Sequence, residues 1–165
     1  MVYQVGQKVV YGIHGVCSIV DVEQKRIDRK NICYYVLEPM DQPGSRYYIP
    51  CENQTALAKI RPLCTKQALL AMLKEPLPQD AWIQDENCRK QCYHDLISAV
   101  DLKALVRMIR CLRMHRQQQV ETGKKLHLSD ENFLRDAQRI LSAEIALVMD
   151  IPVSQVDAYL ENILE

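Results

Sequence analysis

The hydrophobic pattern of this chain changes its period near Pro62, and that change limits the folds open to it. Before Pro62, apolar and polar residues alternate in short runs. After it, apolar residues recur at intervals of three and four. Alternation is typical of half-buried strands, and the longer interval is typical of amphipathic helices. We therefore predict an α+β protein, with a β-rich module over residues 1–62 and an all-helical domain over residues 63–165.

Short strands are expected in the first module over residues 8–11, 16–23, 32–37, 46–49 and 58–61. The charged segment 24–31 is expected to connect the second strand to the third. Pro43 and Gly44 form a turn, because Pro fixes φ and Gly tolerates a positive φ. Several short strands within about 60 residues suggest a small barrel, since closure removes exposed strand edges.

Five helices are expected in the second domain, each with a residue that begins it. Thr65, Asp80, Asp101 and Ser129 are the expected N-caps of the first four, and Pro152 with Ser154 opens the last. The second helix is expected to begin near Trp82. Its apolar positions are Cys88, Cys92, Leu96 and Ile97.

Charge and hydropathy exclude few functions. The 21 basic residues balance the 21 acidic ones, so net charge says nothing about a polyanionic partner. The start of the chain lacks a signal-peptide pattern. Its longest apolar stretch, residues 145–149, is far shorter than the roughly 20 residues of a membrane span. We expect a cytoplasmic protein without a membrane partner.

The seven cysteines are odd in number, irregularly spaced and without a Cys-x-x-Cys motif. Reduced thiols that act as small apolar residues are the expected state. Cys88 with Cys92, and Cys111 with His115, lie one helical turn apart, so a zinc site is geometrically possible. Burial of these cysteines on apolar stripes is the favoured alternative, and we predict no metal and no cofactor.

Motifs for catalysis are missing from the sequence. The histidines lie in no nucleophile, metalloprotease or phosphate-loop pattern, and the five glycines form no Gly-x-Gly-x-x-Gly. We predict that the protein is not an enzyme.

Basic residues are concentrated between residues 103 and 125, where Glu121 is the only acid. Spacings of three and four keep the first five near one helix face. A solvated face is one interpretation, and a phosphate-binding surface is the other. The residues are Lys103, Arg107, Arg110, Arg113, Arg116, Lys124 and Lys125.

Trp82 is the only tryptophan and follows a proline-rich linker. A single Trp at the start of a helix is more often a core anchor than a contact residue. Its immediate neighbours are mostly polar, however, and polar surroundings favour a surface position. An exposed indole beside basic residues could stack on bases or wedge between them. Both interpretations remain open.

Several segments together resemble the CarD family of bacterial transcription regulators, whose N-terminal module is similar to the polymerase-interacting domain of the transcription-repair coupling factor. The segments occur in the family's order over nearly the full chain. They are residues 5–11, His14-Gly15, Tyr48-Ile49-Pro50, Trp82, residues 123–130 and residues 143–149.

The resemblance implies a Tudor-like β-module that binds the β subunit of RNA polymerase. Where relatives carry an arginine in each of two strands, this chain has Lys25 beside Arg26, and Tyr48 near Arg46. These four are the expected polymerase-binding residues. The usual Gly-Asp before the third helix is Val100-Asp101 here, so the turn is expected to differ.

The resemblance also implies that the helical domain contacts promoter DNA near the upstream edge of the −10 region and stabilises the open complex. Such binding would use the DNA backbone and minor groove with little sequence specificity. The chain is expected to act as a monomer. The alternatives are a protein-only adaptor and a zinc-sensing regulator. The expected DNA-binding residues are Trp82, Arg89, Lys90, Lys124 and Lys125, joined by Arg107 and Arg110 from the basic helix face.

Overall fold

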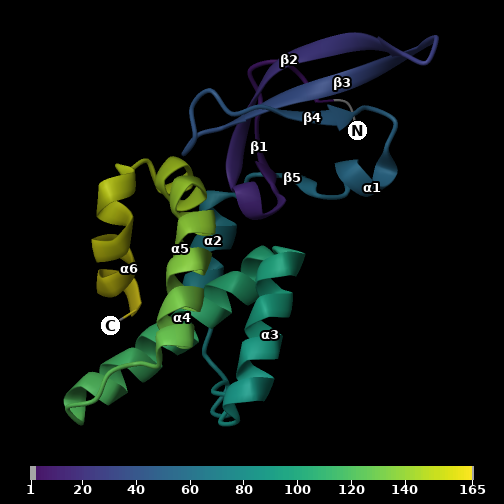
Figure 1. Cartoon of the computed structure of the whole chain (residues 1–165). Helices are drawn as coiled ribbons and strands as arrows, with labels where there is room; N and C mark the ends of the chain where they lie inside the picture. Colours follow the sequence, from purple (N-terminus) through teal and green to yellow (C-terminus); the bar gives the residue numbers. More distant parts are fainter. Residues whose placement is uncertain (1–2, 165) are drawn as a thin grey trace. The chain divides into compact units, whose positions relative to one another are not determined.

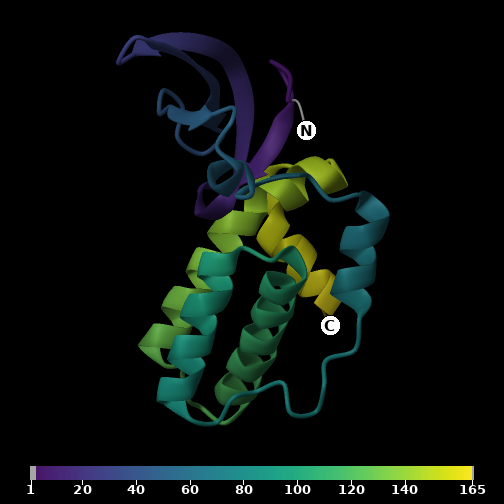
Figure 2. The same ribbon diagram turned by 90° about the vertical axis from the view of Figure 1, so that its right-hand side faces the viewer.

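The structure, a computed structural model, describes residues 3–164 of the chain. It divides into two compact units, Met1–Leu63 and Cys64–Glu165, which we call the N-terminal unit and the helical unit. The first is built from strands and the second from helices (Figures 1 and 2). The predicted α+β class is confirmed. Over the described residues, no helix is both long and apolar enough to cross a membrane.

The N-terminal unit holds one antiparallel sheet of five strands in the order β4-β3-β2-β1-β5. The predicted closed barrel is wrong, because β4 and β5 are the two edges and do not pair with each other among residues 3–164. Edge strand β4 has four residues and edge strand β5 has three, so each leaves few backbone groups unpaired. The strands are β1 (Lys8–Tyr11), β2 (Val16–Ile27), β3 (Lys30–Pro39), β4 (Tyr47–Pro50) and β5 (Ile60–Pro62).

The hairpin of β2 and β3 is longer than the sequence suggests. The segment predicted as a connection belongs mostly to the strands, and only Asp28 and Arg29 form the turn. Their φ angles are 48° and 65°. Two positive φ angles are typical of the tight turns whose twist matches that of paired strands. Figure 1 shows this hairpin as the longest ribbon of the sheet.

One face of the sheet forms the core of the N-terminal unit. Its buried side chains alternate along the strands, as the period of two requires. A short helix, α1 (Gln54–Leu57), packs beside them through Ala56 and Leu57, and the sequence did not predict it. The buried residues of this core are Tyr3, Val9, Cys17, Ile19, Tyr35, Leu37, Ile49 and Ile60.

The helical unit is built around α4, which packs against α2, α3 and α5 (Figure 2). Its core holds apolar side chains from all of the longer helices, among them Leu105, Leu112, Leu134 and Leu141. The helices are α2 (Lys66–Lys74), α3 (Glu86–Ala99), α4 (Leu102–Glu121), α5 (Leu128–Met149) and α6 (Val156–Leu164). The 3₁₀ turns are η1 (Gly12–His14) and η2 (Val153–Gln155).

Two of the predicted N-caps are confirmed and two are wrong. Thr65 accepts a hydrogen bond from Ala68, and Asp101 accepts one from Ala104. The cap of α3 is Asp85 in place of Asp80, so Trp82 lies before the helix. Ser129 does not cap α5, because that helix already begins at Leu128 and Ser129 lies within its first turn.

Three of the four predicted apolar positions of α3 are confirmed, because Cys92, Leu96 and Ile97 pack against the helical core. Cys88 is exposed, and Arg89 and Tyr93 are buried instead. Cys92 is half-buried at the edge of the core. An arginine can occupy the inner face only if its charge is compensated there.

The turn between α3 and α4 contains a residue in the left-handed backbone conformation that is not a glycine. Val100 ends α3 with φ 53° and ψ 34°, and its N–H donates to the Leu96 carbonyl. This conformation is uncommon for a β-branched residue. Val100 packs at the border of the helical core, and this contact compensates the strain.

Candidate binding surfaces

Two of the expected polymerase-binding residues meet on the face of the sheet opposite the core of the N-terminal unit. The Lys25 ammonium lies 3.5 Å from the centre of the Tyr48 ring. Lys25 also approaches Glu23 at 3.6 Å, and Tyr34 meets Tyr48 edge to face. Strand register places these four side chains on one face, across β2, β3 and β4. The result is an aromatic patch with one positive and one negative charge, of which the sequence indicated only Lys25 and Tyr48.

The other two expected residues lie apart from this patch. Arg26 follows Lys25 along β2, so its side chain points to the opposite face of the strand. Arg46 precedes β4 and is exposed. All four expected residues therefore belong to the same strands or their ends, but the structure brings only Lys25 and Tyr48 into contact.

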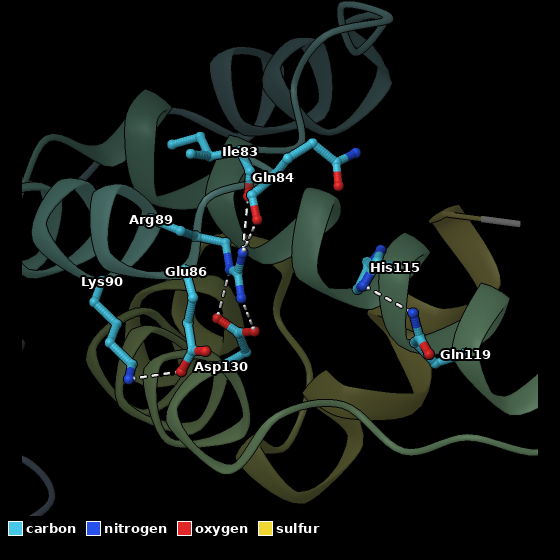
Figure 3. A network of polar contacts seen from close by, with 8 residues as sticks. All are labelled: Ile83, Gln84, Glu86, Arg89, Lys90, His115, Gln119 and Asp130. Carbon is cyan, nitrogen blue, oxygen red and sulfur yellow. Dashed lines mark hydrogen bonds and ion pairs between the residues drawn. The ribbon is translucent and has the colours of Figure 1, made fainter.

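Arg89 lies inside the helical unit with 2% of its surface exposed. Its Nε and Nη2 donate to the two carboxylate oxygens of Asp130, at 2.9 and 2.8 Å. Its Nη1 donates to the carbonyls of Ile83 and Gln84, at 2.8 and 3.3 Å (Figure 3). The carboxylate raises the pKa of Arg89 further above its usual range. This corrects the expected surface position, because a buried guanidinium with four hydrogen bonds does not offer its charge to a phosphate.

Trp82 is half-buried and packs against the helical core. Its ring stacks on His115 of α4, with centroids 3.6 Å apart and planes 13° apart. The Arg89 guanidinium lies 4.5 Å from the same ring. The Arg89–Asp130 pair thus helps to hold the segment before α3 and the indole that it carries.

His115 is held neutral by the same surroundings. Burial lowers its pKa below the ordinary 6.5, and the nearby Arg89 charge lowers it further. His127 acts in the same direction, and Asp130 acts against it. The side-chain amide of Gln119 lies 3.1 Å from Nε2 of His115 (Figure 3). A neutral imidazole can stack on the indole without bringing a charge into the contact.

Acidic groups from other helices neutralise much of the basic face of α4. Glu75, just after α2, pairs with Lys103 at 3.1 Å and with Arg107 at 3.7 Å. Arg110 donates to the carbonyls of Met72 and Glu75, at the C-terminal end of α2. Partial burial lowers the pKa of Arg110. The expected DNA contacts Arg107 and Arg110 therefore already have partners within the unit.

Arg113 and Arg116 are paired as well. Arg113 is buried and pairs with Asp157 and, at 3.9 Å, with Glu161 of α6. Arg116 approaches Glu131 of α5 at 3.9 Å. An open cavity of about 840 Å³ borders this part of α4, lined in part by Arg110, Arg113 and Arg116. Glu161 also lines this cavity, so its lining carries charges of both signs.

Three lysines expected to contact DNA lie near the surface. The side chain of Lys90 is 43% exposed and pairs with Glu86 one turn earlier, at 2.6 Å (Figure 3). Lys124 and Lys125 are exposed in the loop that joins α4 to α5. The helical unit as a whole has 13 basic and 15 acidic residues, a formal charge of −2. A unit with this charge gains little from non-specific attraction to DNA.

No group of three or more His, Cys, Asp or Glu residues is placed to share a metal ion within residues 3–164. Cys88, Cys92, Cys111 and His115 thus do not form the four-ligand arrangement that their spacing allowed. The zinc-sensing alternative receives no support from the geometry.

Asp130 and Glu75 are the functional residues that the sequence did not reveal. Asp130 lies in the acidic first turn of α5, and its carboxylate is buried against Arg89. Its partner is 41 positions away, and no local pattern signals that pairing. Glu75 ends α2 beside Pro76, and its ion pairs with Lys103 and Arg107 also join residues far apart in the sequence.

Comparison with known families identifies the first of the two units. Residues 3–63, a little over a third of the chain, match the CarD-like/TRCF RID domain. The chain therefore carries a CarD-like/TRCF RID domain at its N-terminus, as its resemblance implied. This domain points to a transcription regulator that interacts with RNA polymerase, and it is typically non-catalytic in CarD proteins. Among curated proteins, no sequence matched this chain.

Proposed function

We propose that this chain is a non-enzymatic transcription regulator that binds the β subunit of RNA polymerase through its N-terminal unit and promoter DNA through its helical unit. The observation that carries the proposal is the CarD-like/TRCF RID domain at residues 3–63. The chain acts as a monomer in the cytoplasm. On the promoter it stabilises the open complex near the upstream edge of the −10 region.

The patch around Tyr48 supports docking by the N-terminal unit. Tyrosine and arginine are enriched among the residues that dominate binding energy at protein interfaces. Tyr48 is 40% exposed and is held by Lys25 and Tyr34, so little side-chain entropy remains to be lost on binding. Arg46, exposed just before β4, adds positive charge next to the strand that carries Tyr48.

Co-purification with polymerase tests the docking. The full chain carrying Lys25→Glu and Arg46→Glu is expected to lose the β subunit. The matched control carries Lys8→Glu and Lys59→Glu, two exposed lysines of the same unit, and changes net charge equally. Retention of the β subunit by the first variant, or equal loss by both, contradicts the assigned surface.

Trp82, Lys90, Lys124 and Lys125 support the contact with DNA. An apolar ring inserted at an unstacked base step costs a few kcal/mol, which backbone contacts offset. Trp82 also has to leave its stack on His115, and the loss of that contact adds to the cost. With a helical unit of charge −2, the contact requires the high local concentration that docking on polymerase supplies. Arg89 is left out of this surface because it is buried against Asp130, and Arg110 because its Nη1 is engaged by the carbonyls of Met72 and Glu75.

Open-complex lifetime on a promoter tests the DNA contact. Trp82→Ala is expected to shorten that lifetime in the presence of polymerase. His115→Ala breaks the same stack but keeps the indole, so it is expected to preserve or lengthen the lifetime. If Trp82→Ala leaves the lifetime unchanged while co-purification is intact, the indole does not act on DNA.

A protein-only adaptor is the second candidate, and two observations favour it. The basic face of α4 is paired with Glu75, Asp157 and Glu131, and Trp82 packs against the helical core. In that function, polymerase binding remains and the helical unit meets a second protein. Crosslinking from Lys90, Lys124 or Lys125 within the polymerase–promoter complex separates the two, because an adaptor gives protein adducts and no DNA adducts.

A further inference from the structure

Two of the seven cysteines lie side by side at the border of the sheet. Cys33 is in β3, and Cys51 directly follows β4. Their sulfur atoms are 2.9 Å apart. A disulfide joins sulfurs at about 2.05 Å, so the pair has to approach by only about 1 Å to bond.

The backbone already holds the two residues opposite each other. Cys51 N–H donates to the Cys33 carbonyl at 2.9 Å, and the adjacent residues Tyr34 and Pro50 are register partners. Opposed residues of antiparallel strands have Cα atoms about 4.5 to 5.5 Å apart. This distance lies within the range of about 4.4 to 6.8 Å found for disulfides. Bond formation therefore needs no movement of the strands.

Both thiols are only half-buried, so a small oxidant can reach them. They lie at the edge of the N-terminal core, where Cys51 packs against its outer residues. The other thiols of the described chain vary in burial, and Cys64 and Cys92 are half-buried like this pair. Cys17 and Cys111 are enclosed, for example, and burial raises the pKa of Cys17 to about 12.

We propose that Cys33 and Cys51 are an oxidation site, at which a peroxide converts the two thiols into an intramolecular disulfide that fixes the edge strand β4 to β3. The thiolate of one cysteine attacks a peroxide oxygen, giving a sulfenic acid and one water. The second sulfur then attacks the sulfenic sulfur and releases another water. Two thiols lose two electrons and two protons, and one hydrogen peroxide becomes two waters. A dithiol reductant reverses the step by thiol–disulfide exchange.

The rate of this reaction depends on pH. Burial, followed by the hydrogen bond with Cys33, raises the pKa of Cys51 to about 11. The thiolate is the reacting form, so attack by Cys51 is slow near neutral pH and accelerates as pH rises.

Peptide mapping of the full chain tests the bond. Trypsin separates residues 31–46 from residues 47–59, and each fragment contains one cysteine. After hydrogen peroxide and alkylation of the remaining thiols, we expect the two fragments to be linked in the wild type and in Cys88→Ser. Cys88 is exposed, so its variant controls for general thiol oxidation. Cys33→Ser and Cys51→Ser are expected to give no link.

Hydrogen exchange tests the effect on the strand. In the oxidised wild type, the amides of β4 are expected to exchange roughly tenfold more slowly than in the reduced protein. A dithiol reductant is expected to restore the original rates. The proposal is overturned if Cys33 and Cys51 remain separately alkylated or end as sulfinic acids. It is equally overturned if the link forms and exchange in β4 does not change. The wild type alone decides both outcomes, whether or not the serine variants fold, and polymerase binding is not involved in either.

Discussion

At the scale of single residues, His115 links burial to protonation. Its pKa is lowered in the folded chain, first by burial and then by Arg89, so the unfolded chain binds the proton more tightly. Stability is therefore complete above the ordinary pKa of about 6.5 and falls as pH drops below it, towards the lowered folded value. Asp130 opposes this shift, and His127 adds to it.

Thermal melts at several pH values check this expectation. Between pH 7.5 and pH 5, the melting temperature of the wild type is expected to fall further than that of His115→Gln, whose side chain does not titrate. Other acids contribute equally to both proteins, so the difference between them isolates His115. Parallel pH profiles would contradict the assigned role of its burial.

Asp150 gives a second prediction at this scale. It is exposed and ends α5 with φ 57° and ψ 50°, a conformation that favours glycine. Its negative charge also lies at the unfavourable end of the helix dipole. Asp150→Gly is expected to raise the free energy of unfolding by about 1 kcal/mol. Asp150→Asn removes only the charge and should give a smaller gain in chemical denaturation; a loss of stability in the glycine variant would exclude this explanation.

At the scale of elements, the Arg89–Asp130 pair joins α3 to α5. Removing one partner of a buried ion pair leaves the other charge without compensation, at a cost of about 3 to 5 kcal/mol. Asp130→Asn is therefore expected to lower the stability of the helical unit by roughly 3 kcal/mol. Urea unfolding followed by far-ultraviolet circular dichroism measures it.

The pair of Glu86 and Lys90 provides the control for that prediction. It links two residues of α3 at 2.6 Å, but both side chains are nearly half exposed. Exposed pairs one turn apart contribute only about 0.3 to 0.5 kcal/mol. Glu86→Gln is expected to change the urea midpoint little, and similar losses in the two variants would mean that burial does not set the value of the inner pair.

Elements with a strong local period could be predicted from the sequence, and features decided by distant residues could not. The strands β1 to β5 and the helices α2 to α5 follow their hydrophobic periods, and Thr65 and Asp101 cap where expected. Both Asp80 and Asp85 fit the cap pattern of α3, so local chemistry could not choose between them. Burial of Arg89 depends on a partner 41 residues later.

The candidate site shows the same division. The pairing of Lys25 with Tyr48 crosses a strand, and only the register of β2, β3 and β4 brings the two together. The basic face of α4 was visible as a pattern, but its neutralisation by Glu75 and Asp157 was not. The prediction of a closed barrel was wrong because closure requires the edge strands β4 and β5 to pair, and the local pattern of each strand does not reveal its neighbours.

At the scale of the whole molecule, charge is distributed so that neither sign dominates. Glu75 holds two cations of the basic face, and its removal is expected to release them. Glu75→Gln should therefore tighten non-specific DNA binding at low salt by roughly two- to fivefold. Fluorescence anisotropy with a labelled duplex over a salt series measures the effect.

Glu52→Gln is the matched variant for this measurement. It changes the net charge of the chain equally, but its exposed side chain is in the N-terminal unit. An effect confined to Glu75→Gln supports a DNA surface on α4. Equal effects of the two substitutions would point to net charge alone and would favour the adaptor.

The stacking of the only tryptophan on His115 gives the protein a built-in optical reporter. All indole emission comes from one position, between α2 and α3, and no dye has to be attached. A partner that draws Trp82 away from the imidazole changes the intensity and the wavelength of that emission, whereas a partner that binds only the sheet leaves both unchanged. Light from a single side chain therefore distinguishes engagement of one unit from engagement of the other.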